Sequence, residues 1–427
     1  MSNLQMSYAI QKKGGTELNR LYEEDKSIHD WYRFVLSYPP HLVRDYIKKF
    51  DLDSNACILD PFAGTGTTLV EAKKLGLKSV GIEANPVVQM AASTKITWDV
   101  NTSGLLSNAE KIISIASDKL EEYGSSYLSL TTDQEKLIIT NSISEKPLHK
   151  VLVLLNTIQE HADDNFKNHF KSALAKQSVF SFSNLHFGPE VGVKRKKLDD
   201  APVLDLWFSQ IEQMAFDIEM HYDNRFIQSK VHLGDARDIE SILEPNSIDA
   251  IITSPPYPNE KDYTRTTRLE SVLLGFMQNK ADLRFAKNKL LRSNTRNVYK
   301  GDDDSTWVES NQRIQLLAES IENKRIELGK TSGFEKLYHK VVRLYFGGMA
   351  KHLHSLKPKL KPGAKLAYVV GDQASFFRTP IRTGEILADV ASGLGYEVLG
   401  IDLFRTRLST VTKEQLREEV VLLRWNG

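Results

Sequence analysis

The fold of this chain can be read from residues 57–68, which spell Cys57-Ile58-Leu59-Asp60-Pro61-Phe62-Ala63-Gly64-Thr65-Gly66-Thr67-Thr68. The first four residues predict a short buried strand, and the two glycines predict a turn whose backbone can approach a ligand closely. The following apolar spacing predicts a helix with Leu69, Ala72 and Leu75 on one face. A strand, a glycine loop and a helix in this order are typical of the nucleotide-binding start of a doubly wound sheet.

A second predicted strand, residues 79–82, ends in Glu83. This position is about 20 residues after the glycines, where an acidic side chain commonly holds ribose hydroxyls. The glycine loop lacks the third glycine of dinucleotide-binding proteins and the lysine of a phosphate-binding loop. A cofactor that carries a ribose but no phosphate fits better, and S-adenosylmethionine is the obvious one. A glycine turn with a purely structural role is the alternative.

A strand-like run, residues 248–253, leads into a second motif, Ser254-Pro255-Pro256-Tyr257. The two prolines should end the strand, remove two backbone donors and fix φ at both positions. We expect a stiff loop that presents carbonyl oxygens and the Ser254 hydroxyl as acceptors beside one aromatic ring. Such a loop suits a planar base with an exocyclic amino group, because the oxygens accept its N–H protons while Tyr257 stacks on the ring. A simple strand-ending turn is the alternative.

Together, the Asp60-Pro-Phe-Ala-Gly-Thr-Gly-Thr-Thr and Thr253-Ser-Pro-Pro-Tyr motifs resemble those of the amino-group DNA methyltransferases. These enzymes make N4-methylcytosine or N6-methyladenine, with S-adenosylmethionine as the methyl donor. The Ser-Pro-Pro-Tyr spelling is more usual in the cytosine-N4 group, and Asp-Pro-Pro-Tyr is more usual in the adenine group. The resemblance covers about residues 30–95 and 228–427, and the segments between them match no family that we can name.

The resemblance implies which residues form the site. The catalytic loop would consist of Ser254, Pro255, Pro256 and Tyr257, and the cofactor would be bound by Asp60, Pro61, Phe62, Gly64, Gly66, Thr67, Glu83 and Asp235. Asp235 follows the predicted strand 229–233, where the family carries an acidic residue that takes the adenine amino group; a turn-initiating aspartate is the alternative. The sequence shows no His/Cys cluster that suggests a metal. The sole cysteine, Cys57, lies outside the catalytic loop, which disfavours methylation at the ring carbon of cytosine.

The expected fold is α/β, a doubly wound, mostly parallel sheet of the Rossmann-like methyltransferase type with helical insertions. Residues 28–99 and 226–427 are expected to form the catalytic domain. Residues 100–225 are expected to form a mainly helical insertion, and residues 258–335 a second insertion. Either insertion, or both, could contact and read the DNA.

The carboxyl-terminal part of the sheet has its own signals. Residues 366–370 predict a strand that follows a turn at 361–364. Residues 396–401 and 419–423 predict a closing antiparallel pair. These strands would complete the sheet of the catalytic domain.

Composition is that expected of a cytoplasmic enzyme. The chain has 427 residues and one cysteine, so no disulfide framework is expected. No apolar run approaches the roughly 20 residues of a membrane span, and no membrane partner is expected. The formal net charge is only +1. A surface that binds DNA would therefore have to concentrate its positive charge locally.

Basic residues do cluster along the chain. Residues 280–300 carry seven Lys and Arg side chains against Asp282 alone. The candidates for phosphate contact are Lys287, Lys289 and Arg292, together with Arg265 beside the catalytic loop. Further clusters are Lys194-Arg195-Lys196-Lys197 and the lysines at 357, 359, 361 and 365. A solvated helix face or loop is the alternative for any one cluster.

The sequence thus predicts a site-specific methyltransferase that acts on an exocyclic amino group in double-stranded DNA, with cytosine N4 as the favoured acceptor. Such an enzyme would belong to a restriction-modification or defence system and could have partner proteins there. Three alternatives stay open: an adenine-N6 enzyme, an enzyme that methylates an amino group of an RNA base, and an inactive subunit that binds DNA.

Overall fold

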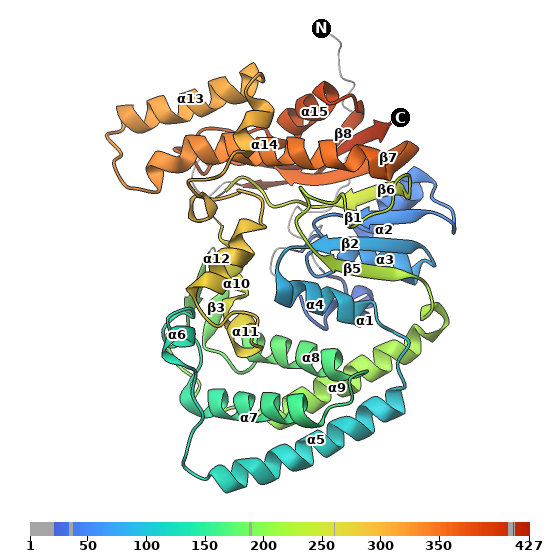
Figure 1. Ribbon diagram of the computed structural model, residues 1–427, viewed down its shortest axis with the longest axis vertical. Helices are drawn as coiled ribbons and strands as arrows, with labels where there is room; N and C mark the ends of the chain where they lie inside the picture. Colours follow the sequence, from blue (N-terminus) through green and yellow to red (C-terminus); the bar gives the residue numbers. More distant parts are fainter. Residues whose placement is uncertain (1–20, 34–36, 188–189, 260, 409–412, 414) are drawn as a thin grey trace.

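The computed structural model describes residues 21–33, 37–187, 190–259, 261–408, 413 and 415–427. Its centre is a seven-stranded sheet with the order β5-β2-β1-β6-β7-β9-β8 (Figure 1). The strands are β1 (Cys57–Asp60), β2 (Lys78–Glu83), β5 (Ser229–Leu233), β6 (Ile248–Thr253), β7 (Leu360–Gly371), β8 (Glu397–Leu408) and β9 (Gln415–Trp425). The first five strands in the sheet order run parallel, and β9 is antiparallel to both of its neighbours.

The order of the strands reverses at the middle of the sheet. The chain starts at β1, moves outward through β2 to β5, and then returns to β6 on the other side of β1. This switch point opens a crevice beyond the carboxyl ends of β1 and β6, which is where open α/β sheets bind ligands. The predicted fold class, a doubly wound and mostly parallel sheet, is confirmed, as is the closing antiparallel pair.

Helices cover both faces of the sheet. On one face α2 (Pro40–Phe50) packs its apolar side onto β1, β6, β7 and β9. On the other face lie α14 (Tyr338–Leu356) and α15 (Thr383–Gly393), which bury the alternate side chains of the same strands. Two short helices follow the first two strands, α3 (Thr67–Lys74) and α4 (Pro86–Lys95).

A layer of helices lies beyond the β5 edge of the sheet, at the bottom of Figure 1. It contains α5 (Thr102–Tyr123), α6 (Thr132–Glu135), α7 (Glu145–His161), α8 (Lys167–Phe180) and α9 (Val203–Met220). The layer shares one apolar core with α4. Between α8 and α9 the chain forms an antiparallel hairpin, β3 (Leu185–Phe187) and β4 (Val191–Val193). The hairpin interrupts the segment 100–225, which is otherwise mainly helical, as predicted.

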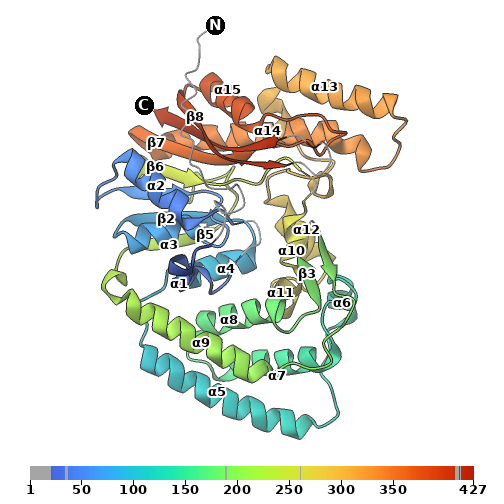
Figure 2. The same cartoon turned by 180° about the vertical axis from the view of Figure 1, so that it is seen from behind.

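The segment after the catalytic loop forms a bridge from the sheet to this helical layer (Figure 2). It contains α10 (Tyr263–Thr266), α11 (Arg268–Leu273) and α12 (Lys280–Asn288), and α11 shares the apolar core of the layer. The chain then makes a short 3₁₀ turn, η5 (Asp304–Val308), against α14 and continues into α13 (Gln312–Glu327). A first short helix, α1 (Lys26–His29), lies beside α9.

Two local predictions were wrong. Residues 361–364, predicted as a turn, lie within β7, because the strand absorbs Pro362 and Gly363 as an irregularity between the pairs Ile248–Leu360 and Ala250–Lys365. Leu75, predicted to share one face of α3 with Leu69 and Ala72, follows the last helical residue, Lys74, and is 48% exposed. Among the described residues, no helix combines the length and the apolar character needed to cross a membrane.

Candidate active site

A cavity of about 740 Å³ opens at the carboxyl ends of the parallel strands. Both sequence motifs line it, the glycine loop after β1 and the catalytic loop after β6. The predicted residues in its wall are Pro61, Phe62, Gly64, Thr67, Glu83, Asp235, Ser254, Pro255, Pro256, Tyr257 and Lys289. Two motifs that are almost 200 residues apart in the chain therefore meet at the switch point of the sheet.

Asp60 joins the two loops from below. It is fully buried, and its Oδ1 accepts hydrogen bonds from the Thr253 hydroxyl (2.6 Å) and the Phe62 amide (3.1 Å). Its Oδ2 accepts from the Tyr38 hydroxyl at 3.1 Å. Burial raises the pKa of Asp60 to about 6, although its hydrogen bonds work in the opposite direction. The side chain thus connects the end of β1 to the end of β6, beneath the cavity wall.

The glycine loop depends on backbone conformations that only glycine adopts easily. Gly64 has φ 50° and Gly66 has φ 83°. A Cβ at Gly66 would lie 3.3 Å from the Cβ of Ala92 in α4, so Gly66 also lets the loop pack closely on that helix. Gly66 therefore shapes the loop from behind, whereas Gly64 faces the cavity.

Glu83 is held at the rim of the cavity by two backbone amides. Its Oε2 accepts from the Gly64 N–H at 2.9 Å, and its Oε1 accepts from the Asn85 N–H at 2.8 Å. Burial raises the pKa of Glu83 to about 7, against the opposing effect of these bonds. The carboxylate is thereby fixed in orientation, and it carries a charge that a ligand with donor groups would stabilise.

Asn85 is a cavity residue that the sequence reasoning missed. Its amide nitrogen donates to the Thr267 hydroxyl at 2.9 Å, while its Oδ1 is buried and has no hydrogen-bond partner in the structure. A buried acceptor of this kind is expected to have a donor, which a bound ligand could supply. The available signal was the position of Asn85, two residues after Glu83 and immediately before Pro86, which begins α4.

The predicted catalytic loop, Ser254-Pro255-Pro256-Tyr257, lies against the end of β7. The Ser254 hydroxyl donates to the Val369 carbonyl at 3.2 Å, which directs the oxygen's lone pairs elsewhere. Burial raises the pKa of the Tyr257 hydroxyl above its ordinary value. The Tyr257 ring packs over Gly371, where a Cβ would lie only 2.8 Å from the ring. Gly371 therefore provides the space that the Tyr257 ring occupies, a contact between distant segments that has no signal in the sequence.

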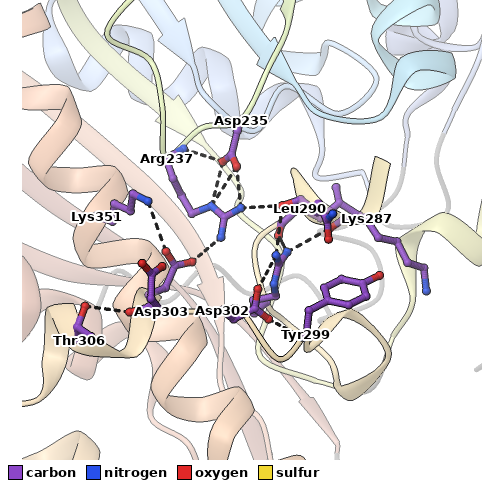
Figure 3. A network of polar contacts seen from close by, with 12 residues as sticks. Asp235, Arg237, Lys287, Leu290, Tyr299, Asp302, Asp303, Thr306 and Lys351 are labelled. Carbon is purple, nitrogen blue, oxygen red and sulfur yellow. Dashed lines mark hydrogen bonds and ion pairs between the residues drawn. The ribbon is translucent and has the colours of Figure 1, made fainter. Parts of the chain in front are cut away.

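Asp235 lines the cavity at the end of β5. Its carboxylate is bound by Arg237, two residues further on, through the backbone amide and the guanidinium (Figure 3). Arg237 also lines the cavity. The spacing Asp235-Ala236-Arg237 was visible in the sequence, but its meaning depends on partners from elsewhere in the chain.

Two residues predicted to contact DNA are internal. Lys287 is 8% exposed and pairs with Asp262 at 2.8 Å, and Arg292 is 4% exposed and pairs with Asp302 at 2.8 Å. Their burial argues against a phosphate contact, because both charges are already neutralised inside the protein. The charge count over residues 280–300 could not reveal these partners.

The other two residues predicted to contact DNA, Lys289 and Arg265, are accessible. Lys289 lines the cavity, with its amine 4.7 Å from the centre of the Phe285 ring. Arg265 is partly exposed and lies 3.7 Å from the carboxylate of Glu190, a residue that also lines the cavity. In the described part of the chain, no group of three or more His, Cys, Asp and Glu side chains could hold a metal ion.

Comparison with known proteins gives a consistent picture. The model of the N6/N4 methyltransferase family, described as DNA methylase, matches residues 4–93. The Type II methyltransferase M.BsoBI of Geobacillus stearothermophilus is 26% identical over 435 residues, a match that covers 94% of this chain and 85% of that protein. M.AvaI of Nostoc sp., also a Type II methyltransferase, is 23% identical over 412 residues, covering 88% of this chain and 80% of that protein.

A third relative matches a smaller part of the chain. The Type II methyltransferase M.MjaII of Methanocaldococcus jannaschii is 25% identical over 332 residues, which covers 56% of this chain and 61% of that protein. Among solved structures, the rRNA methyltransferase aviRa from Streptomyces viridochromogenes aligns with a TM-score of 0.34 at 9% identity, over 98% of this chain and 95% of that chain. That likeness is too low to support an argument. The sheet order, the two loops that share one cavity, the family model and the Type II relatives together support an amino-group DNA methyltransferase family, whose members use S-adenosylmethionine as the methyl donor.

Proposed function

We propose that the protein transfers a methyl group to N4 of cytosine in double-stranded DNA, as the modifying enzyme of a restriction-modification system. The observation that carries this proposal is the meeting of the Ser254-Pro-Pro-Tyr loop and the glycine loop in one cavity. Serine at the first position of the catalytic loop supports cytosine over adenine, as the family resemblance implies. The names of the relatives, which are Type II methyltransferases, support the restriction-modification context.

The cavity fits S-adenosylmethionine, which supplies an electrophilic methyl group on a sulfonium. Its volume of about 740 Å³ lies within the usual range for ligand sites, about 300–1,000 Å³. We assign the ribose hydroxyls to Glu83 and the adenine amino group to Asp235. The loop residues Pro61, Phe62, Gly64 and Thr67 would lie along the ligand. The unpartnered Oδ1 of Asn85 offers one further acceptor.

The catalytic loop would activate the amino group of the target base. An exocyclic amine is a poor nucleophile because its lone pair is delocalised into the ring. Ser254 Oγ and the Pro255 carbonyl would accept hydrogen bonds from the N–H groups and so increase the electron density on nitrogen. Ser254 is prepared for this role, because its own proton is donated to Val369. Attack on the methyl group then needs no covalent enzyme intermediate, since both reactants are held close together.

The target base must leave the duplex to reach this loop, because its amino group is otherwise paired within the helix. Tyr257 would stack on the extruded base, and Gly371 fixes the height of the Tyr257 ring. In this proposal Tyr257 holds the base by stacking and does not transfer a proton. The raised pKa of its hydroxyl agrees with that assignment.

The function is tested by mass spectrometry of nucleosides from duplex DNA that has been incubated with the protein and methyl-labelled S-adenosylmethionine. We expect label in N4-methylcytosine. Label in N6-methyladenine would correct the acceptor. The absence of label in DNA would overturn the proposal, and a parallel incubation with RNA shows whether RNA is methylated instead. A Ser254→Ala variant serves as the control for a contaminating activity, because its turnover should be strongly reduced.

A second prediction concerns the ring of Tyr257. Gly371→Ala would place a Cβ 2.8 Å from this ring and displace it. We expect kcat to fall at least tenfold, as it should in Tyr257→Ala, while the Kd for S-adenosylhomocysteine stays within about twofold. Gly393→Ala, at the end of α15 in open space, is the matched control. An equal loss of cofactor affinity in Gly371→Ala would mean that the substitution disturbs the whole site.

A third prediction follows from the pKa of Glu83, which burial raises to about 7. Only the ionised carboxylate is a pure acceptor for ribose hydroxyls, so the affinity for S-adenosylhomocysteine should fall as the pH drops below about 7. The loss is at most about tenfold per pH unit for one group. Calorimetric titrations between pH 6 and 8.5 measure it. Glu83→Gln should bind more weakly and with a flatter profile, and unchanged affinity in this variant would remove the ribose assignment.

We place the DNA phosphate contacts on the basic loop, which we define as residues 194–197 at the end of the β3–β4 hairpin. All four side chains are exposed and carry positive charge. The buried Asn184 holds both ends of this loop, since its carbonyl accepts from the Lys194 amide (2.7 Å) and its Oδ1 accepts from the Leu198 amide (2.8 Å). Glu190 of the same hairpin lines the cavity. At about 3.3 Å per residue, the basic loop begins no more than about 13 Å away, within reach of neighbouring phosphates.

The basic loop can be tested through the salt dependence of DNA binding. Substitution of Lys194, Arg195 and Lys196 by glutamine should reduce the slope of log K against log salt by about 2 to 3, because each lost phosphate contact contributes about 0.9. The control is the same substitution at three exposed lysines near the amino ends of the strands, Lys48, Lys78 and Lys230. Equal slopes in the two variants would move the contact surface elsewhere.

A further inference from the structure

Arg237 links the cavity to a segment far away in the sequence. Its guanidinium donates to both carboxylate oxygens of Asp235, with Nη2 at 2.6 Å from Oδ2 and Nε at 3.0 Å from Oδ1. The same guanidinium donates through Nη1 to Asp304 of η5, and through Nη2 to the Asn288 carbonyl at 3.1 Å. Figure 3 shows Arg237 between Asp235 on one side and the turn that carries Asp302 and Asp303 on the other.

This network is buried and charged. Arg237 and Asp304 have side chains that are 8% and 5% exposed, and Asp235 is 21% exposed at the cavity. Burial alone would lower the pKa of Arg237, but hydrogen bonds and the charges of Asp235 and Asp304 raise it overall, so the guanidinium stays charged. The planar fork of an arginine fixes the orientation of a carboxylate in a way that a lysine cannot.

Two glycines in helix α14 leave space for this network. The helix carries Gly347 and Gly348 at its middle, where glycine is less favourable for a helix than alanine. A Cβ at Gly347 would lie 1.9 Å from the Asp304 carbonyl oxygen, and one at Gly348 would lie 3.2 Å from Asp304 Oδ2 and 3.5 Å from Arg237 Cδ. The two glycines therefore allow η5 to approach the helix closely enough for Asp304 to reach Arg237.

We propose that Arg237 is a positioning residue for the cofactor site, held in place from the second insertion by Asp304. Asp235 is oriented by its bonds to Arg237, yet the Nε proton is shared between its two oxygens. The carboxylate thus keeps capacity for one more donor on its exposed side. That donor is the adenine amino group, so this inference rests on the role proposed for Asp235. Cofactor affinity then depends on Asp304, which lies outside the cavity wall.

The test compares two neutral substitutions in the same insertion. Asp304→Asn removes the charge that holds Arg237, whereas Asp302→Asn removes a similarly buried carboxylate that pairs with Arg292 instead. Each full-length variant is titrated with S-adenosylhomocysteine and with its inosine counterpart, in which oxygen replaces the adenine amino group. Thermal unfolding verifies that both variants are folded. Arg237→Lys is a second variant that weakens the contacts of residue 237 with Asp235 and Asp304.

We expect Asp304→Asn and Arg237→Lys to raise the Kd for S-adenosylhomocysteine about tenfold and to change the Kd for the inosine compound by no more than about twofold. Asp302→Asn should change neither. Equal weakening by Asp302→Asn and Asp304→Asn, or equal loss of both compounds, would overturn the proposal. If the wild-type chain bound the two compounds with equal affinity, Asp235 would not contact the adenine amino group and the proposal for Arg237 would be overturned. Methyl transfer itself would not be contradicted. Failure of the wild-type chain to bind either compound would contradict the proposed function as well.

Discussion

The hydrogen bond from Thr253 to Asp60 is the interaction on which the site depends. It joins the last residue of β6 to the last residue of β1, and Thr68 adds a second link from α3 to the Ile252 carbonyl. A buried carboxylate needs such partners, because burial without them would be costly. The relative position of the two loops is therefore set by the sheet and not by a ligand. Methyl transfer between two separately bound groups requires that fixed geometry.

The same burial shapes the electrostatics of the cofactor side. The pKa values of Asp60 and Glu83 rise to about 6 and about 7 because both groups are withdrawn from water. Only Glu83 of the two lines the cavity, so on the proposed function a cation with hydroxyl donors would gain more from its buried carboxylate than from an exposed one. Asp235 differs from them, because Arg237 neutralises it permanently. The cavity wall thus contains one carboxylate with a raised pKa, Glu83, and one that is paired with an arginine, Asp235, whereas Asp60 lies beneath the wall.

Local patterns allowed the sheet and the two loops to be predicted, because strands, glycine turns and proline stops depend on neighbours in the chain. The roles of the site residues remain predictions. What the sequence could not reveal are contacts between distant segments. Lys287 and Arg292 looked like a DNA-binding surface until their partners Asp262 and Asp302 became visible. Gly371 had no signal at all, since its role depends on a tyrosine from another loop.

Both insertions contribute residues to the cavity wall, Glu190 from the first and Lys289 from the second, so on the proposed function both would lie close to the DNA. Arg268 of α11 donates to the Leu137 carbonyl, and Gln134 of α6 donates to Gln278. Apolar side chains of the two insertions, including those of α8 and α11, share one core. On the proposed function, a duplex that delivers a base to Tyr257 meets the β3–β4 hairpin from one insertion and Lys289 from the other.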